Sequence, residues 1–283
     1  MLQVTQTGEA IRTVAERVGP AVAGLGRGWG RGSGVVIAPG RVLTVAHVLR
    51  GEDVAVTIGG GDSVHGRLLA ADPDADVAVI AADTGDAEPV TWAPEAAAAA
   101  GIGTPVFALA DPSGRGLRVT LGFVSAAGHP VRGPRGRPIA GSLEHTAPLP
   151  RGSSGGPLVD GEGHLLGLNA VRLEGGLILA LPADAAMRAH VESLARGEIA
   201  SRPRLGLALA RTRGDGLLVR AVQEASPAAV SGLARGDRLV AVDGRPLRGV
   251  DDLFDALDGA RGALTLTVER AGEARDVAIS SLQ

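Results

Sequence analysis

Most of this chain consists of short apolar runs broken by turn residues, and only a few segments have the spacing of a helix. One such segment lies near the N-terminus, where four apolar residues fall at i, i+3, i+4 and i+7 before Gly19-Pro20 ends the pattern. The four are Ile11, Val14, Ala15 and Val18. We therefore expect residues 1–20 to form an N-terminal helical segment.

The pattern changes at residue 21, where short apolar runs alternate with Gly, Pro and Asp. Runs of this length with turn signals between them are typical of strands in an all-β barrel or sandwich. A doubly wound α/β fold would need long helical patterns between the strands, and the sequence has none there. The clearest runs are 34–40, 54–58, 77–82, 105–110, 119–128 and 163–171.

The C-terminal third has a different organisation. Helical spacing returns over 183–197 and ends at Gly197, and the polar residues that follow, which include a proline, predict a linker over 198–204. The remaining residues, 205–283, form a second unit with four strand-like runs and two short helical patterns. The main unit is then 21–197.

Composition limits the classes of function. The net charge of −3 favours neither nucleic acid nor an anionic membrane as a partner. The absence of cysteine excludes disulfides, thiolate metal sites and a cysteine nucleophile. The chain as given has no apolar run that could span a membrane and no visible signal peptide. We expect a soluble chain, either cytoplasmic or exported without its targeting segment.

The sharpest chemical signal is the segment 152-GSSGGPL-158. Glycines around a serine suit a nucleophile on a tight turn, where the backbone must approach the substrate carbonyl. Ser154 would attack, and the N–H groups of Gly152 and Ser154, with Ser153 between them, would form the oxyanion hole. Taken alone, an ordinary glycine-serine turn stays open as an alternative.

Two further segments supply a base and an acid. His47 follows an apolar run, and Asp76 directly precedes another, although Asp72 and Asp74 compete with it on residue type alone. The order His, Asp, Ser is that of the chymotrypsin-type triad. An esterase of the α/β-hydrolase kind would place the histidine last, so that alternative fails.

These segments resemble the catalytic blocks of the HtrA (DegP-type) family of trypsin-like serine proteases. The similar blocks here are 32-GSGVVI-37, 43-LTVAHV-48, 76-DVAV-79, 111-DPSG-114, 119-VTLGFVS-125, 152-GSSGGPL-158 and 180-ALP-182. The resemblance implies a mainly β fold, a chymotrypsin-like double β-barrel, with His47, Asp76 and Ser154 as catalytic residues. It implies no cofactor and no metal. Its substrates would be polypeptides, preferably unfolded.

The resemblance also suggests where specificity resides. The family position that carries an acid in trypsin corresponds to Pro148, so a pocket for Arg or Lys is not expected. With Asn169, Ala170 and Val171 on the opposite wall, we expect preference for small or medium aliphatic side chains.

The second unit resembles a PDZ domain, a small β-sandwich or barrel with two helices. The segment 226-SPAAVSGLARGDRLVAVDG-244 carries this resemblance. It implies that the loop of Arg204, Leu205, Gly206 and Leu207 binds the terminal carboxylate of a peptide. A plain first strand over 205–209 is the alternative for that loop.

Two questions stay open at this stage. A homo-trimer is one assembly that the resemblance implies, although no aromatic residue precedes Trp29. A catalytically idle peptide-binding or chaperone-like protein on the same fold is the alternative function, and labelling by a serine-reactive fluorophosphonate would separate it from a protease.

Overall fold

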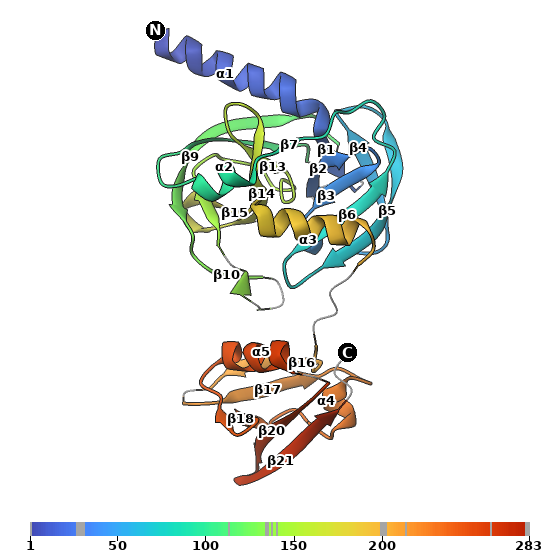
Figure 1. Cartoon of the computed structure of the whole chain (residues 1–283), viewed down its shortest axis with the longest axis vertical. Coiled ribbons are helices and arrows are strands. Elements are labelled where there is room, and N and C mark those ends of the chain that lie inside the picture. The colour runs from blue at the N-terminus through green and yellow to red at the C-terminus, as the bar shows by residue number, and fades with distance from the viewer. Residues whose placement is uncertain are drawn as a thin grey trace. The chain divides into compact units, whose positions relative to one another are not determined.

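The chain folds into two compact units, Met1–Ile199 and Ala200–Gln283. The computed structural model describes residues 2–26, 32–112, 114–133, 136, 138–139, 141–198, 203–212, 214–260 and 262–280. Residues 199–202 of the expected linker lie outside the described residues, and Figure 1 shows the two units.

The first unit begins with a closed barrel of six antiparallel strands in the order β1-β2-β3-β6-β5-β4. Five of its strands have four to seven residues, whereas β5 has ten and runs through Gly66. Closure of the barrel leaves no unpaired edge in this sheet. The strands are β1 (Val22–Leu25), β2 (Gly32–Ala38), β3 (Arg41–Thr44), β4 (Asp53–Ile58), β5 (Ser63–Asp72) and β6 (Val77–Ala82).

A second sheet follows in the order β13-β8-β9-β12-β15-β14-β7, and β13 also pairs with β14. That additional pairing closes six of its strands into a second barrel, so the expectation of a mainly β double barrel is confirmed. A separate hairpin joins β10 (Val131–Arg132) and β11 (Pro138–Ile139). The other strands are β7 (Thr91–Trp92), β8 (Pro105–Ala110), β9 (Arg118–Ala127), β12 (Leu143–His145), β13 (Pro157–Val159), β14 (His164–Arg172) and β15 (Ile178–Pro182).

Three helices lie on the outside of these barrels (Figure 1). The first, α1 (Leu2–Val18), buries Val14 and Val18, two residues of its apolar face. A short helix, α2 (Pro94–Ala99), packs on β14, and α3 (Ala185–Ala195) packs on β5 and β6. Asp184 caps α3 by accepting a hydrogen bond from the Met187 N–H at 2.9 Å.

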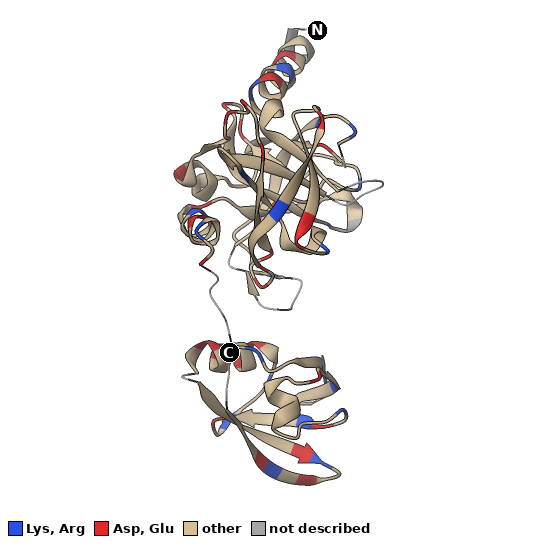
Figure 2. Ribbon diagram, turned by 90° about the vertical axis from the view of Figure 1, so that its right-hand side faces the viewer, with Lys and Arg blue, Asp and Glu red and all other residues tan. Residues whose placement is uncertain are grey.

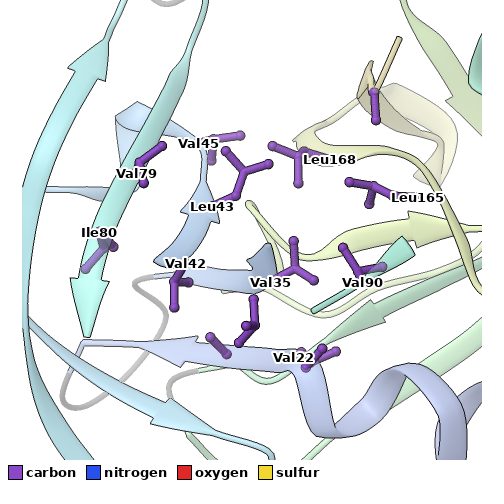
Figure 3. Packing of buried hydrophobic residues seen from close by; sticks show 14 of the residues in the cluster. Val22, Val35, Val42, Leu43, Val45, Val79, Ile80, Val90, Leu165 and Leu168 are labelled. Atoms are coloured by element: carbon purple, nitrogen blue, oxygen red, sulfur yellow. The ribbon is translucent and has the colours of Figure 1, made fainter. Parts of the chain in front are cut away.

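The core of the first unit is built from Val, Leu, Ile and Ala, as the low aromatic content of 2% requires. Figure 3 shows side chains of the first barrel pointing toward Leu165 and Leu168, which come from β14 of the second. Because one cluster of buried side chains includes residues of both barrels, the barrels are held against each other. The labelled residues that belong to the first barrel are Val22, Val35, Val42, Leu43, Val45, Val79 and Ile80.

The second unit has its own core around a sheet in the order β16-β17-β18-β20-β21, with β19 on β18. Two helices complete it, as expected for a PDZ domain. The strands are β16 (Leu207–Arg211), β17 (Leu217–Val222), β18 (Arg238–Val242), β19 (Arg245–Pro246), β20 (Ala263–Arg270) and β21 (Glu273–Ser280), and the helices are α4 (Pro227–Val230) and α5 (Val250–Gly259).

Charged residues of both signs are interspersed over both units in the view of Figure 2. This agrees with the small net charge of −3. Among the described helices, none is both long and apolar enough to cross a bilayer.

Candidate active site

His47 and Asp76 meet where two paired strands of the first barrel end. His47 lies in a short 3₁₀ turn (Ala46–Val48) just after β3, and Asp76 lies just before β6. These strands are antiparallel neighbours, so the end of one lies beside the start of the other. His47 Nδ1 is 2.7 Å from Asp76 Oδ2, and the His47 backbone N–H donates to Asp76 Oδ1 at 2.9 Å. One carboxylate therefore fixes both the backbone and the ring of the histidine.

The turn before β6 explains why Asp76, and neither of its acidic neighbours, contacts His47. Asp72 Oδ1 accepts hydrogen bonds from the N–H groups of Asp74 and Ala75, at 2.8 and 3.1 Å. Asp76 then takes a left-handed backbone with φ of 57°, a conformation that costs a residue with a side chain about 1 kcal/mol or more. Asp72 Oδ2 lies instead 3.1 Å from His190 Nε2 on α3.

Ser154 is held beside the first barrel by the loop that precedes β13. The Ser33 N–H of β2 donates to Ser154 O at 2.8 Å, and the Thr44 hydroxyl donates to Ser33 O at 2.7 Å. Gly155 has φ of +90°, and a Cβ there would lie 2.2 Å from both Ser33 O and Thr44 Oγ1. Glycine is required at this position because the nucleophile loop touches β2 directly.

The hydroxyl of Ser154 donates to Ala170 O at 2.8 Å. Within the described part of the chain it makes no hydrogen bond to His47, whose ring is about one-third exposed. His47 lies just after β3 and Ser154 bonds to Ser33 of the neighbouring strand β2, but no hydrogen bond joins their side chains in the described structure. Such loose contacts are common in ligand-free active sites and tighten when substrate binds.

The loop also offers free backbone donors beside Ser154. Among the described residues, no acceptor is bound to the N–H groups of Gly152, Ser153 and Ser154. Gly152 has φ of +87°, and its carbonyl accepts from the Ser33 hydroxyl at 3.0 Å. That bond fixes the orientation of the Gly152 carbonyl, and the N–H groups without a partner can donate hydrogen bonds to an oxyanion.

A cavity of about 350 Å³ adjoins Ser154. Asn169, Ala170 and Val171 line it together with the nucleophile loop, whereas Pro148 is not among its lining residues and the next residue, Leu149, is. A larger hollow of about 680 Å³ lies near Asp62 and Asp83 and contains none of the three candidate catalytic residues.

Asn169 also holds the loop that carries Ser154, through hydrogen bonds to Gly155, Gly156 and Pro157. Its side-chain amide donates to Gly156 O at 2.9 Å and to Pro157 O at 3.1 Å, and its backbone oxygen accepts from Gly155 N at 2.6 Å. The Asn169 Oδ1 atom is therefore an acceptor, so His145 Nε2, at 2.9 Å, carries the proton and donates. Nothing in the sequence signals this contact, since His145 and Asn169 are 24 positions apart.

His145 is fully buried, and its Nδ1 has no partner among the described residues. Burial lowers the pKa of His145 below 6.5, with the Asn169 hydrogen bond acting weakly in the opposite direction. At pH 7 the ring is therefore neutral in the folded protein.

We expect the pH dependence of stability to reveal this neutral histidine. Because the folded pKa lies below the unfolded value of 6.5, the unfolded chain binds the extra proton first, and stability is lost as pH falls below 6.5. The free energy of unfolding should fall relative to His145→Gln by up to about 1.4 kcal/mol per pH unit. Urea unfolding followed by tryptophan fluorescence measures this, since Trp92 lies on β7 of the first unit. Equal pH slopes in the two proteins would contradict it.

Asp160, Glu162 and His164 are the one group of potential metal ligands found in the described residues, with ligand atoms within 4.8 Å of one another. Asp160 Oδ1 accepts from the N–H groups of Glu162 and His164, both at 2.9 Å, and Asp160 Oδ2 is 2.9 Å from His164 Nδ1. These bonds build the tight turn between β13 and β14.

In the second unit, the predicted carboxylate-binding loop leads into β16, whose first residue is Leu207. Gly206 has φ of +76°, and a Cβ there would lie 2.2 Å from the Ser226 Cβ. Gly206 O accepts from Gln223 N at 2.8 Å and Leu205 O accepts from Ala228 N at 3.1 Å. No described residue accepts from the N–H groups of Leu205 and Gly206.

Comparison with known families agrees with the two-unit architecture. A model described as a trypsin-like peptidase domain matches residues 32–168, and a PDZ domain model matches residues 218–270.

The chain is also similar to several named proteases. It is 33% identical to the putative serine protease HhoA of Synechocystis sp., covering 86% of this chain and 65% of that protein. It is 29% identical to the chloroplastic Protease Do-like 1 of Arabidopsis thaliana, covering 85% and 60%. It is 27% identical to a probable periplasmic serine endoprotease, DegP-like, of Brucella suis, covering 89% and 53%. The chain thus spans 53–65% of the length of these relatives.

Solved structures of proteases share the fold of this chain. The serine endoprotease from Yersinia pestis superposes with a TM-score of 0.64 at 27% identity, covering 96% of this chain and 98% of that one. The HtrA-type protease AlgW with a decapeptide has a TM-score of 0.66 at 23% identity over 96% and 98%, a likeness of fold. The chain is therefore a homologue of the HtrA and DegP serine proteases, and it contains a trypsin-like peptidase domain followed by a PDZ domain.

Proposed function

We propose that this protein is an ATP-independent serine endopeptidase of the HtrA type that hydrolyses peptide bonds of unfolded or damaged proteins. The observation that carries the proposal is the double hydrogen bond of Asp76 to the ring and backbone of His47, at 2.7 and 2.9 Å. A buried carboxylate in this position holds the imidazole with a proton on Nδ1, which leaves Nε2 free to act as a base.

In the proposed reaction His47 Nε2 removes the proton of the Ser154 hydroxyl while Oγ attacks the peptide carbonyl carbon. The imidazolium then gives that proton to the leaving amine, and an acyl-enzyme remains on Ser154. Water attacks the ester with His47 again as the base, and the proton returns to Ser154. Asp76 stabilises the charged ring in both steps without itself taking a proton.

The negative charge on the carbonyl oxygen would be bound by the N–H groups of Gly152 and Ser154, with Ser153 in the same loop. The free state of these donors supports the assignment. A donor of this kind contributes about 3 kcal/mol to transition-state stability. The cavity with Asn169, Ala170 and Val171 on its wall would receive the side chain that precedes the scissile bond, and the segment after Pro148 forms its opposite side.

The PDZ unit would bind peptide C-termini and regulate the protease. Its strand β16 is an edge of the sheet, so a peptide can add to it as a further strand. The loop of Arg204, Leu205, Gly206 and Leu207 lies at the start of this strand, and the N–H groups of Leu205 and Gly206 have no acceptor among the described residues. Backbone donors of this kind bind a terminal carboxylate.

A catalytically idle peptide-binding protein is the second candidate function. The observation in its favour is that the Ser154 hydroxyl donates to Ala170 O and makes no bond to His47 within the described residues. On this alternative, the serine stays in that rotamer whether or not a peptide occupies the PDZ unit.

Fluorophosphonate labelling of the whole chain separates the two functions. We expect Ser154 to be labelled, as mapped by mass spectrometry of the tryptic peptides, and an unfolded protein substrate to be cleaved without ATP. Addition of a peptide with a free C-terminus is expected to speed labelling, and the same peptide amidated at its C-terminus is the control. No labelling with either peptide would refute the protease and favour the idle protein.

A further inference from the structure

Two arginines line the cavity beside Ser154, and no acidic residue does. Its full lining is Leu149, Pro150, Arg151, Gly152, Ser153, Ser154, Asn169, Ala170, Val171, Arg172 and Ile178. Among the described residues that line this wall, the only formal charges are therefore the guanidinium groups of Arg151 and Arg172, both positive.

Arg172 reaches from one side of the cavity to the other. It is the last residue of β14 and pairs with Ile178 of β15, next to a register shift between Asn169 and Val171. Its Nη2 donates to Leu149 O, on the segment that leads to the nucleophile. This bond fixes one end of the guanidinium and leaves its other N–H groups available to a ligand.

Neither arginine is neutralised by a carboxylate of the described chain. Elsewhere in the same structure Arg188 pairs with Glu192 at 3.1 Å and Arg270 with Asp237 at 2.6 Å. For Arg151 and Arg172, no ion pair to any described acidic residue is found. Two uncompensated positive charges thus lie at the place where a substrate side chain would enter.

The chemistry of such a cavity selects its occupant. A carboxylate there gains charge-assisted hydrogen bonds to a guanidinium, whereas a lysine or arginine side chain is repelled. A valine or alanine side chain would displace water from the guanidinium groups and offer them no acceptor in return, which is unfavourable.

We propose that this protease cleaves after acidic residues, with Arg172 as the main specificity-determining residue and Arg151 in support. The residue that precedes the scissile bond, P1, would be Glu or Asp, with its carboxylate bound by the Arg172 guanidinium. The inference rests on the proposed peptidase function and names its substrate class. It differs from the aliphatic preference that the sequence suggests, because that expectation considered the missing acid at Pro148 and not the charge of Arg172.

The test compares four peptides that differ only at P1, which is Glu, Gln, Val or Arg. Gln has the shape of Glu without its charge, so the ratio of kcat/KM for Glu to that for Gln isolates the effect of the carboxylate. We expect this ratio to be about tenfold or more in the wild-type chain, since a hydrogen bond to a charged group is worth that much. Cleavage after Arg should be slowest.

Two variants assign the preference to Arg172. Arg172→Gln should bring the Glu-to-Gln ratio close to one, and Arg172→Glu should make the Arg peptide a better substrate than the Glu peptide. The second variant predicts a gained activity, which a misfolded protein cannot show. Arg188→Gln, on the outer face of α3, is the matched control and should leave the ratio unchanged.

The outcomes separate this inference from the proposed function. Labelling of Ser154 together with preferred cleavage after Val would overturn the acidic specificity and leave the peptidase in place. A Glu-to-Gln ratio that Arg172→Gln does not change would also overturn it. Absence of both labelling and cleavage would overturn both proposals.

Discussion

Replacing Ser154 by alanine is expected to lower kcat for peptide cleavage by roughly 10⁶-fold, the magnitude found when the nucleophile of a serine-protease triad is removed. Without the hydroxyl there is no atom to form the acyl-enzyme, and only the binding and oxyanion groups remain to accelerate attack by water. This loss should appear in single-turnover cleavage as well as at steady state.

The fold should survive the same change. The one side-chain hydrogen bond of Ser154 in the described structure goes to Ala170 O, so its loss costs about 1 kcal/mol. The backbone bond from Ser33 N to Ser154 O is unaffected. Ser193→Ala, on α3 away from the site, is the matched control. Wild-type cleavage by Ser154→Ala would show that another residue is the nucleophile.

The sequence predicted the strands of the barrels well where turn residues bound an apolar run on both sides. The run 105–110 coincides with β8, and 77–82 coincides with β6. It did not predict β5, whose apolar positions are interrupted by His65, Gly66 and Arg67. In a closed barrel every strand is paired on both sides, so pairing can hold a strand that its own pattern would not identify.

At the candidate site, the sequence selected three residues but did not indicate how each is held. The order of His47, Asp76 and Ser154 and the blocks around them were enough to select the candidates. The choice of Asp76 over Asp72 has a physical cause, the turn that Asp72 builds, which depends on hydrogen bonds that no pattern displays. The His145–Asn169 bond joins two strands, and Arg172 acts through its side-chain direction after a register shift. Both follow from tertiary pairing alone.

For the helical segments too, the sequence predicted the extent of a helix but not its contacts. The predicted pattern over 183–197 contains α3, and its C-terminal stop at Gly197 agrees with a φ of +78° there. The contact of His190 on α3 with Asp72, 3.1 Å away, was not predicted. It depends on how α3 packs against β5 and β6.

Replacing Asp76 by asparagine is expected to lower kcat by about 10⁴-fold, with little change in KM. Asp76 accepts two hydrogen bonds, one from the His47 backbone N–H and one from Nδ1–H. Asparagine has one acceptor oxygen. If that oxygen keeps the backbone bond, the amide group faces Nδ1 as a donor, and the ring must carry its proton on Nε2. A protonated Nε2 cannot remove the proton of Ser154, so the base is lost although the geometry is kept.

The measurement is kcat as a function of pH for wild type, Asp76→Asn and Asp74→Asn, with fluorophosphonate labelling rates alongside. Asp74 is the informative comparison because it is as buried as Asp76 and lies two residues away in the same turn, but it makes no bond to His47. Asp74→Asn should therefore lose much less activity than Asp76→Asn. If Asp74→Asn lost about 10⁴-fold and Asp76→Asn stayed near wild type, the acid of the triad would have to be reassigned. If activity is lost only in Asp76→Asn and its urea midpoint is unchanged, the fold is intact. The loss of kcat then comes from the changed tautomer of His47.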